Sequence, residues 1–270
     1  MRQRAHIHVK DVGAGSPILF LHGNPDTCDV WDAVIGRMAG RHRCLAADLP
    51  AFGRSEAPPD FDGSLDALAA WVSDVRGGLG ISEPLDLVVH DFGGLFGIAW
   101  AVRHPEHVRR IAILNTMFFP DYRWHFWARV WRTPILGELS FALNSRWGMA
   151  MEMRRGSKRL PRAHALKAYD NVTPAMTRMV LRLYRAADPA AFASWQDGLR
   201  ALAARVPCIV LWGDRDPYID KRFAERFAAR EVHHFPEAGH WLPVEEPDAV
   251  ADHLLRFFGR DDPGATGDRV

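Results

Sequence analysis

Residues 87–94 restrict the fold of this chain more than any other stretch. They read Leu-Val-Val-His-Asp-Phe-Gly-Gly: an apolar run typical of a buried strand meets an acid and two glycines, and a helix-like pattern begins at Leu95. Glycines let a backbone turn sharply and approach its neighbours closely. A strand, turn and helix in this order hold Asp91 beside the positive N-terminus of the helix, which favours the ionised carboxylate. Asp91 is then either a nucleophile or a helix-capping acid in a tight turn.

Short apolar runs alternate with helical patterns on both sides of this stretch. Because parallel strands need a crossover between them, such alternation predicts a mostly parallel central sheet flanked by helices on both faces. The expected strands lie at 5–10, 16–21, 44–47, 85–89, 110–114, 206–212 and 232–235.

The alternation stops between residues 118 and 204, where helical patterns rich in tryptophan and phenylalanine replace the strands. We therefore expect a core domain made of residues 1–117 and 205–260, with a helical cap at 118–204. A polar, glycine-rich tail at 261–270 is expected to be disordered.

Three candidate catalytic groups follow the ends of predicted strands, in the order Asp91, Asp216, His240. Open α/β sheets place their sites at the carboxyl ends of the strands. A nucleophile, then an acid, then a histidine is the chain order of the α/β-hydrolase triad.

With these residues the chain resembles the α/β-hydrolases that use an aspartate nucleophile, the group containing haloalkane dehalogenases and epoxide hydrolases. The resemblance covers about 15–258. Residues 22–25 (His-Gly-Asn-Pro) are similar to the family's oxyanion loop, and 48–55 to its Asp-x-Pro-Gly-x-Gly-x-Ser turn, with Ala51 in place of the first glycine. It implies an α/β-hydrolase fold with a helical cap inserted after the sixth strand, and an enzyme without cofactor or metal.

The resemblance also implies a role for each residue. Asp91 would attack an sp³ carbon to give an alkyl-enzyme ester, and His240 would activate the water that hydrolyses this ester. Asp216 would orient His240, and the backbone N–H groups of Asn24 and Phe92 would form the oxyanion hole.

The acid of the triad has a rival in Asp214. The family's Gly-x-x-Asp spacing, counted from Gly213, selects Asp216. Some dehalogenases take their acid from just after the preceding strand, but this chain has Asn115 there, which cannot be an anion.

The leaving group stays open, with a haloalkane dehalogenase-like activity favoured over an epoxide hydrolase. Phe92 stands where dehalogenases usually have a halide-binding tryptophan, although Asn24 matches the second donor and one of Trp124, Trp127, Trp131 or Trp147 could replace the first. Epoxide opening needs a cap tyrosine, for which Tyr184 is the candidate.

The expected pocket for a small apolar substrate comprises Asn24, Phe92, Trp124, Trp127, Tyr184 and Trp241. A non-catalytic binding protein on the same scaffold is the minor alternative.

The bulk properties exclude other partners. The net charge is +1 and the pI about 7.9, unlike a nucleic-acid binder. Three cysteines suit a reducing compartment, and neither a signal peptide nor a transmembrane run is found, so a soluble cytoplasmic monomer or homodimer that does not bind membranes is expected. The one basic run, at 154–162, is interpreted as a solvated face of the cap.

Overall fold

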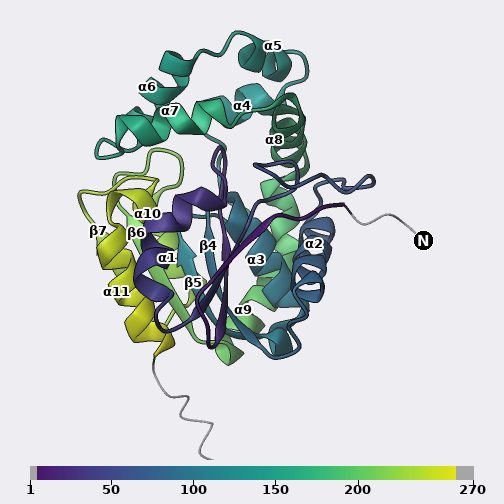
Figure 1. Ribbon diagram of the computed structural model, residues 1–270. Coiled ribbons are helices and arrows are strands. Elements are labelled where there is room, and N and C mark those ends of the chain that lie inside the picture. Colours follow the sequence, from purple (N-terminus) through teal and green to yellow (C-terminus); the bar gives the residue numbers. More distant parts are fainter. Residues whose placement is uncertain (1–4, 260–270) are drawn as a thin grey trace, which may run out of the picture.

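A computed structural model describes residues 5–259 of the chain, so the predicted tail at 261–270 lies outside the described residues. Its seven strands form one sheet in the order β1-β3-β2-β4-β5-β6-β7 (Figure 1). Every neighbouring pair is parallel except β1 and β3, as expected for a mostly parallel sheet. The strands are β1 (Val9–Val12), β2 (Pro17–Leu21), β3 (Arg43–Ala47), β4 (Leu85–His90), β5 (Val108–Leu114), β6 (Cys208–Gly213) and β7 (Glu231–Phe235).

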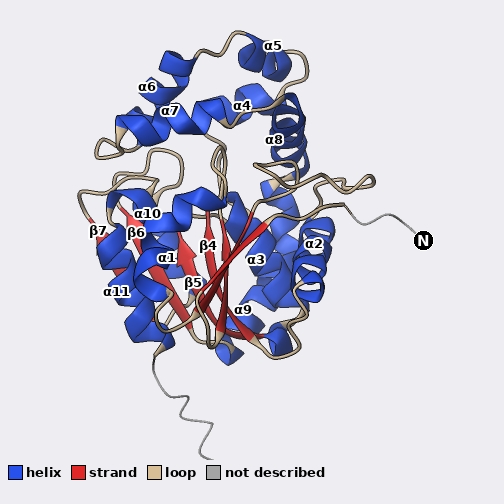
Figure 2. Cartoon of the chain, in the orientation of Figure 1, coloured by secondary structure: helices blue, strands red, loops and turns tan. Residues whose placement is uncertain are grey.

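Helices cover both faces of the sheet (Figure 2). On one face α1 (Asp32–Met38) packs against α11 (Pro247–Phe258); on the other α3 (Phe92–Arg103) packs between α2 (Leu65–Gly78) and α9 (Gln196–Arg205). Along β2 the side chains alternate, with Ile18 and Phe20 in the α1/α11 core cluster and Leu19 and Leu21 in the other. Burial on both faces explains why the strands are continuously apolar.

The chain between β5 and β6 forms a second layer of helices over one end of the sheet, at the top of Figure 1. These are α4 (Phe126–Arg132), α5 (Leu136–Ala142), α6 (Arg146–Gly156), α7 (Arg162–Asp170) and α8 (Pro174–Ala186). None of the helices within residues 5–259 is both long and apolar enough to cross a lipid bilayer.

Two details of the predicted cap need correction. The insertion follows β5, the fifth strand of the described chain, and not a sixth strand. The predicted cap range 118–204 also includes most of α9, which packs against α3 in the core. Amphipathic periodicity predicts a helix but does not tell which surface that helix covers. The other domain boundaries stay a prediction.

The turn between β4 and α3 is as sharp as the sequence predicts. Asp91 has φ 48° and ψ −123°, a conformation that L-residues rarely adopt. The following glycine lies so close to β2 that a Cβ atom at Gly93 would stand 2.3 Å from the carbonyl oxygen of Leu21. Only glycine fits there, so α3 begins directly against β2. Asp91 therefore stands just beyond the carboxyl end of β4, in the middle of the sheet.

We predict that Gly93→Ala destabilises the protein by about 3 kcal/mol, at the upper end of overpacking costs, because backbone atoms of β2 cannot move aside. The matched control is Gly36→Ala on α1, where nothing lies within 4 Å of the new methyl group. That change should stabilise the helix by about 0.5–1 kcal/mol. Equilibrium unfolding in urea measures both, and equal stabilities of the two variants would contradict the account.

Candidate active site

Asp91, Asp216 and His240 meet where the strands end beneath the cap. His240 Nδ1 lies 2.7 Å from Asp216 Oδ2, and His240 Nε2 lies 3.9 Å from Asp91 Oδ1. His240 and Asp216 are buried. The three predicted residues are therefore adjacent in space as well as ordered in sequence; their catalytic roles stay a prediction.

The structure distinguishes the two candidate acids. Asp216 contacts His240, whereas Asp214 contacts Lys221 and His234 on the other side of its loop. Backbone N–H groups of Tyr218 and Ile219 donate to Asp216 Oδ1 at 2.7 and 3.1 Å. Burial alone would raise the pKa of Asp216, but the charge of His240 and these hydrogen bonds outweigh it and hold that pKa below its ordinary value.

Asn115 has a role that the sequence analysis did not assign. Its amide donates to Asp216 Oδ2 at 2.9 Å and to the Gly213 carbonyl at 3.1 Å, and its oxygen accepts from Gly213 N–H at 2.9 Å. It thus fixes both the acid and the end of β6. The only signal in the sequence was an amide directly after a predicted strand. The structure shows that this amide is fully buried and that β5 neighbours β6, neither of which the sequence reveals.

The two oxygens of the Asp91 carboxylate have different surroundings. The backbone N–H of Asn24 donates to Oδ2 at 2.8 Å, and the backbone N–H of Phe92 also bonds the carboxylate. Oδ1 is the oxygen that faces His240. Gly23 permits this approach, because a Cβ there would lie 2.4 Å from both Cβ and Oδ2 of Asp91.

The charges of Asp91 and His240 are coupled. Burial raises the pKa of Asp91 above its ordinary value, while His240 and the two N–H donors oppose this rise. For His240 burial lowers the pKa, but the carboxylates of Asp216 and Asp91 outweigh it and raise the value to about 9. The charges of Asp216 and Asp91 thus favour the protonated form of His240 before any reaction at Asp91.

His90 and His22 brace the surrounding loops. His90 Nε2 lies 2.8 Å from the carbonyl of His240, and burial lowers the pKa of His90 to about 3, so this neutral ring donates to that carbonyl. His22 Nε2 accepts from Leu49 N–H at 3.0 Å. Both histidines therefore hold loops next to the site in place.

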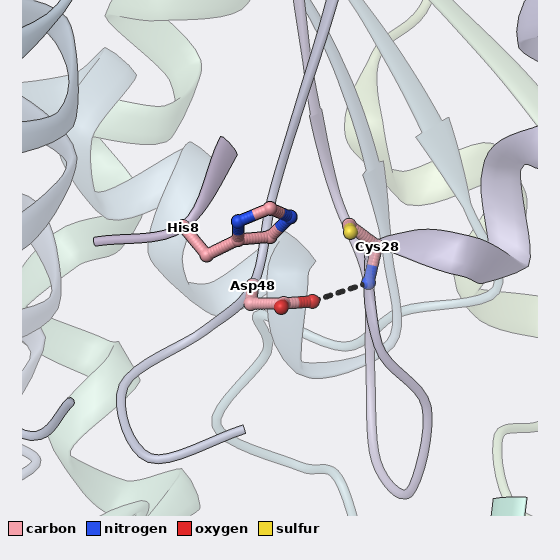
Figure 3. A group of neighbouring side chains, drawn as sticks. All are labelled: His8, Cys28 and Asp48. Carbon is pink, nitrogen blue, oxygen red and sulfur yellow. Dashed lines mark hydrogen bonds between the residues drawn. The ribbon is translucent and has the colours of Figure 1, made fainter. Parts of the chain in front are cut away.

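A nearby group of His8, Cys28 and Asp48 has the residue types of a metal site (Figure 3). Asp48 instead accepts hydrogen bonds from the backbone N–H groups of Cys28 at 2.7 Å and Arg54 at 2.9 Å. Burial raises the pKa of Cys28 to about 12, which keeps the thiol protonated at neutral pH. These contacts favour a structural role, in which Asp48 joins the loops after β2 and β3.

A cavity of about 700 Å³ lies between the cap and the sheet, with Asp91 and His240 in its wall. Of the six predicted pocket residues it is lined by Asn24, Trp124, Trp127, Tyr184 and Trp241. Phe92 is the exception: its ring is buried and packs edge-on against Tyr184, with the centroids 4.7 Å apart, and does not reach the cavity. Only its backbone N–H serves the site, because the first residue of α3 points its side chain into the core.

Two tyrosines and two tryptophans among the candidate donors differ in their contacts. Tyr122 donates its hydroxyl to the carbonyl of Tyr218 at 3.0 Å, whereas the Tyr184 hydroxyl interacts with the Asn24 side chain. The indole N–H of Trp124 is buried and has no acceptor among the described residues. Of the four candidate tryptophans, Trp147 is instead largely exposed on α6.

His125 also lines the cavity and was missed by the sequence analysis. Its Nδ1 accepts from the Ala128 N–H at 3.3 Å, so it caps α4. Burial lowers the pKa of His125 to about 4, which leaves a neutral ring whose proton is on Nε2. The residue stands at a helix start, where a capping function was the only signal in the sequence.

A buried carboxylate, Asp26, connects the cap with the site. It accepts from the Trp241 indole at 2.7 Å, next to His240, and from His164 Nε2 of α7 at 2.8 Å. Burial alone would lower the pKa of His164, but the charge of Asp26 outweighs burial and raises that pKa. For Asp26 burial alone would raise the pKa, but His164 and the hydrogen bond from Trp241 outweigh burial and hold that pKa below its usual value. A charged pair therefore links α7 to the loop of Asn24.

The comparisons with known proteins agree with this geometry. A family model described as alpha/beta hydrolase fold matches residues 16–247. A cis-3-alkyl-4-alkyloxetan-2-one decarboxylase from Shewanella oneidensis is 28% identical, with 96% of this chain and 87% of that protein covered. Haloalkane dehalogenase 2 from Mycobacterium bovis is 28% identical, with 95% and 92% covered. The solved structure of the epoxide hydrolase CorEH has a TM-score of 0.78 at 21% identity, covering 94% of this chain and 95% of that one, which shows a shared fold.

The Asp26–His164 pair predicts a pH-dependent stability. Since the pKa of His164 is raised from 6.5, its contribution is complete below that value and is lost as the pH rises through the raised pKa. Since the pKa of Asp26 is lowered from 3.8, its contribution is present above that value and is lost as the pH falls through the lowered pKa. His164→Gln should therefore cost about 2 kcal/mol near pH 5 and progressively less at alkaline pH. Urea unfolding across pH measures this, and a difference that does not change with pH would contradict the ion pair.

Proposed function

The chain belongs to the α/β-hydrolase fold family and is an enzyme of that fold, and from this premise we propose that it acts through Asp91 as a nucleophile on saturated carbon. Asp91 Oδ1 displaces a leaving group and forms an alkyl ester. Water activated by His240 then hydrolyses the ester, with Asp216 orienting His240. The non-catalytic alternative is set aside.

One observation carries this proposal: the two carboxylate oxygens are already differentiated. Oδ2 accepts from the Asn24 N–H at 2.8 Å, while Oδ1 is the oxygen that faces His240, 3.9 Å from its Nε2. After attack through Oδ1, Oδ2 is the ester carbonyl oxygen, which gains negative charge when water adds to the carboxyl carbon. N–H donors aimed at such an oxygen are worth about 3 kcal/mol each.

Alkylation also prepares His240 for the second step. The negative charge of Asp91 is one of the causes that raise the pKa of His240 to about 9. An ester has no charge, so esterification removes that cause and favours the neutral imidazole needed as a general base. The order of the two steps thus follows from electrostatics within the site.

For the leaving group, a halide is the first candidate. A departing anion needs N–H donors in a site shielded from water. The Asn24 side chain lines the cavity and supplies one such donor. Trp124 also lines it, and a rotation of its ring would turn the indole N–H, which is buried without an acceptor among the described residues, toward the leaving group as a second donor. The similarity to haloalkane dehalogenase 2 supports this assignment.

Epoxide opening is the second candidate, favoured by Tyr184. Burial raises the pKa of Tyr184 well above 10, so its hydroxyl stays protonated and can donate to an epoxide oxygen. Tyr122 is less suited, since its proton is engaged by the Tyr218 carbonyl.

The similarity to the oxetan-2-one decarboxylases supports a third candidate. Attack of Asp91 on the ring carbon bonded to oxygen would break that C–O bond, giving an ester and a free carboxylate. Cleavage of the bond between the carboxylate and the neighbouring ring carbon would then release CO₂, and its electron pair would form the π bond of an alkene. The C–O bond of the ester breaks in the same step, and its electron pair returns to Asp91. This sequence needs no water.

The shared mechanism predicts a trapped intermediate. His240→Phe should retain alkylation of Asp91 but slow ester hydrolysis at least 100-fold, within the usual range for losing a general base. Intact mass after incubation with 1-bromooctane should show the protein plus one octyl group, and Asp91→Asn/His240→Phe should show none. His107→Phe, away from the site, is the control expected to turn over. An adduct that maps to another residue would falsify the nucleophile.

The leaving group is tested by paired variants that each remove one donor. Trp124→Phe should lower the alkylation rate with bromoalkanes by about 10–100-fold, at or below the usual cost of one oxyanion donor. Trp147→Phe, at an exposed ring on α6, should leave it within about threefold. If epoxides are the substrates, Tyr184→Phe should instead abolish diol formation. Halide, diol and alkene with CO₂ are assayed separately with bromoalkanes, epoxides and a cis-dialkyl oxetan-2-one. Diol or alkene without halide release would remove the dehalogenase-like assignment.

A further inference from the structure

We propose that the cavity binds a long unbranched alkyl chain, which runs from the reacting carbon at Asp91 to an opening between α5 and α6. This inference rests on the proposed function for the position of the reacting carbon. It specifies the small apolar substrate expected from the sequence as one with an extended alkyl chain.

The size of the cavity is the first reason. Its volume of about 700 Å³ falls in the range of roughly 300–1,000 Å³ that holds drug-sized ligands. A halide or epoxide group with two or three carbons would leave most of this space to water, against a largely apolar wall. A ligand that excludes water from the whole cavity must therefore be much longer than the reacting group.

The lining is the second reason. Five methionines contribute to the wall: Met117, Met149, Met151, Met153 and Met176. Asp91 and His240 mark the catalytic end, and the α5–α6 side also carries polar residues, Ser140, Asn144, Ser145, Glu152 and Arg155, in a wall that is apolar for the most part. Methionine side chains are flexible and unbranched, so they repack around ligands of variable shape. Such a wall suits a flexible polymethylene chain better than a rigid ring.

The opening is the third reason. Leu143, after α5, and Met151, in α6, both line the cavity, yet they are 82% and 74% exposed. The same cavity therefore extends from Asp91 to the protein surface and ends on apolar side chains. Within residues 5–259 the exposed large hydrophobic residues, apart from Val12, all lie in α4, α5 and α6 of the cap or in the segments that join them. A chain end that emerges here would meet an apolar surface.

Two positions on opposite sides of the cavity allow the chain path to be blocked. Gly148 in α6 lines the cavity, and a Cβ there would meet only the Ser145 hydroxyl within 4 Å. Ser140 in α5 also lines it, and its hydroxyl only bonds the Gly137 carbonyl of its own helix. Leucine at either position would project into the path without touching the catalytic residues.

The experiment measures binding of alkan-1-ols, which have no leaving group, so that binding is separated from catalysis. Titrations of the full chain follow tryptophan fluorescence, using butan-1-ol, octan-1-ol and dodecan-1-ol. In the wild type the Kd should fall about three- to fourfold per added methylene. Gly148→Leu and Ser140→Leu should bind butan-1-ol as the wild type does but lose at least tenfold in affinity for dodecan-1-ol. Gly36→Leu on the exposed side of α1 is the control and should keep the wild-type series.

Two results would overturn the proposal. One is a wild-type Kd that does not fall further for alkanols longer than butan-1-ol. The other is a dependence of Kd on chain length that survives in both leucine variants. The failure of the proposed function has a different signature. In that case 1-bromoalkanes of every length leave Asp91 unmodified in His240→Phe, while the alkanol series still shows the chain-length dependence and its loss in the variants.

Discussion

The hydrogen bond from the Asn24 N–H to Asp91 Oδ2 is the interaction on which the rest of the site depends. It requires the loop after β2 to lie against the turn after β4, which a side chain at residue 23 would prevent. It also leaves Oδ1 turned toward His240, so the two oxygens of one carboxylate face different partners. The strained backbone of Asp91 has a local explanation in this arrangement, since it delivers the carboxylate to a donor fixed on another strand.

The cap takes part in this arrangement. Its residue Gly156 accepts from the backbone N–H of His240 at 3.3 Å, and Ser157 accepts from that of Trp241 at 3.0 Å. Through Asp26, α7 is joined to the same loops by a buried ion pair. The histidine of the triad is therefore positioned from both sides of the cavity, by the strand ends and by the cap. The proposed path for the alkyl chain leaves the cavity near Leu143 and Met151, whereas the contact to His240 is made by Gly156, the last residue of α6.

The fold and the meeting of Asp91, Asp216 and His240 at the strand ends could be predicted from the sequence because each depends on local signals. Alternation of strands and helices predicts the sheet, which is confirmed, and residues after strand ends converge in any parallel sheet. The supporting contacts could not be predicted, because they depend on which elements become neighbours. Asn115 bonds a partner 101 residues away, and Asp26 bonds one 138 residues away, across an interface that only the docked cap creates. The packing of α9 on the core was missed for the same reason.

The central claim is that Asp91 is alkylated and then released by attack of water on its own carboxyl carbon. For a haloalkane or an epoxide, one turnover in water labelled with the heavy isotope of oxygen tests this most directly. The account predicts that, under single-turnover conditions, the label enters the Asp91 carboxylate and the product carries unlabelled oxygen, because the bond cleaved belongs to the enzyme. Peptide mass spectrometry locates the label. Label found in the product of the first turnover, with none at Asp91, would contradict the account.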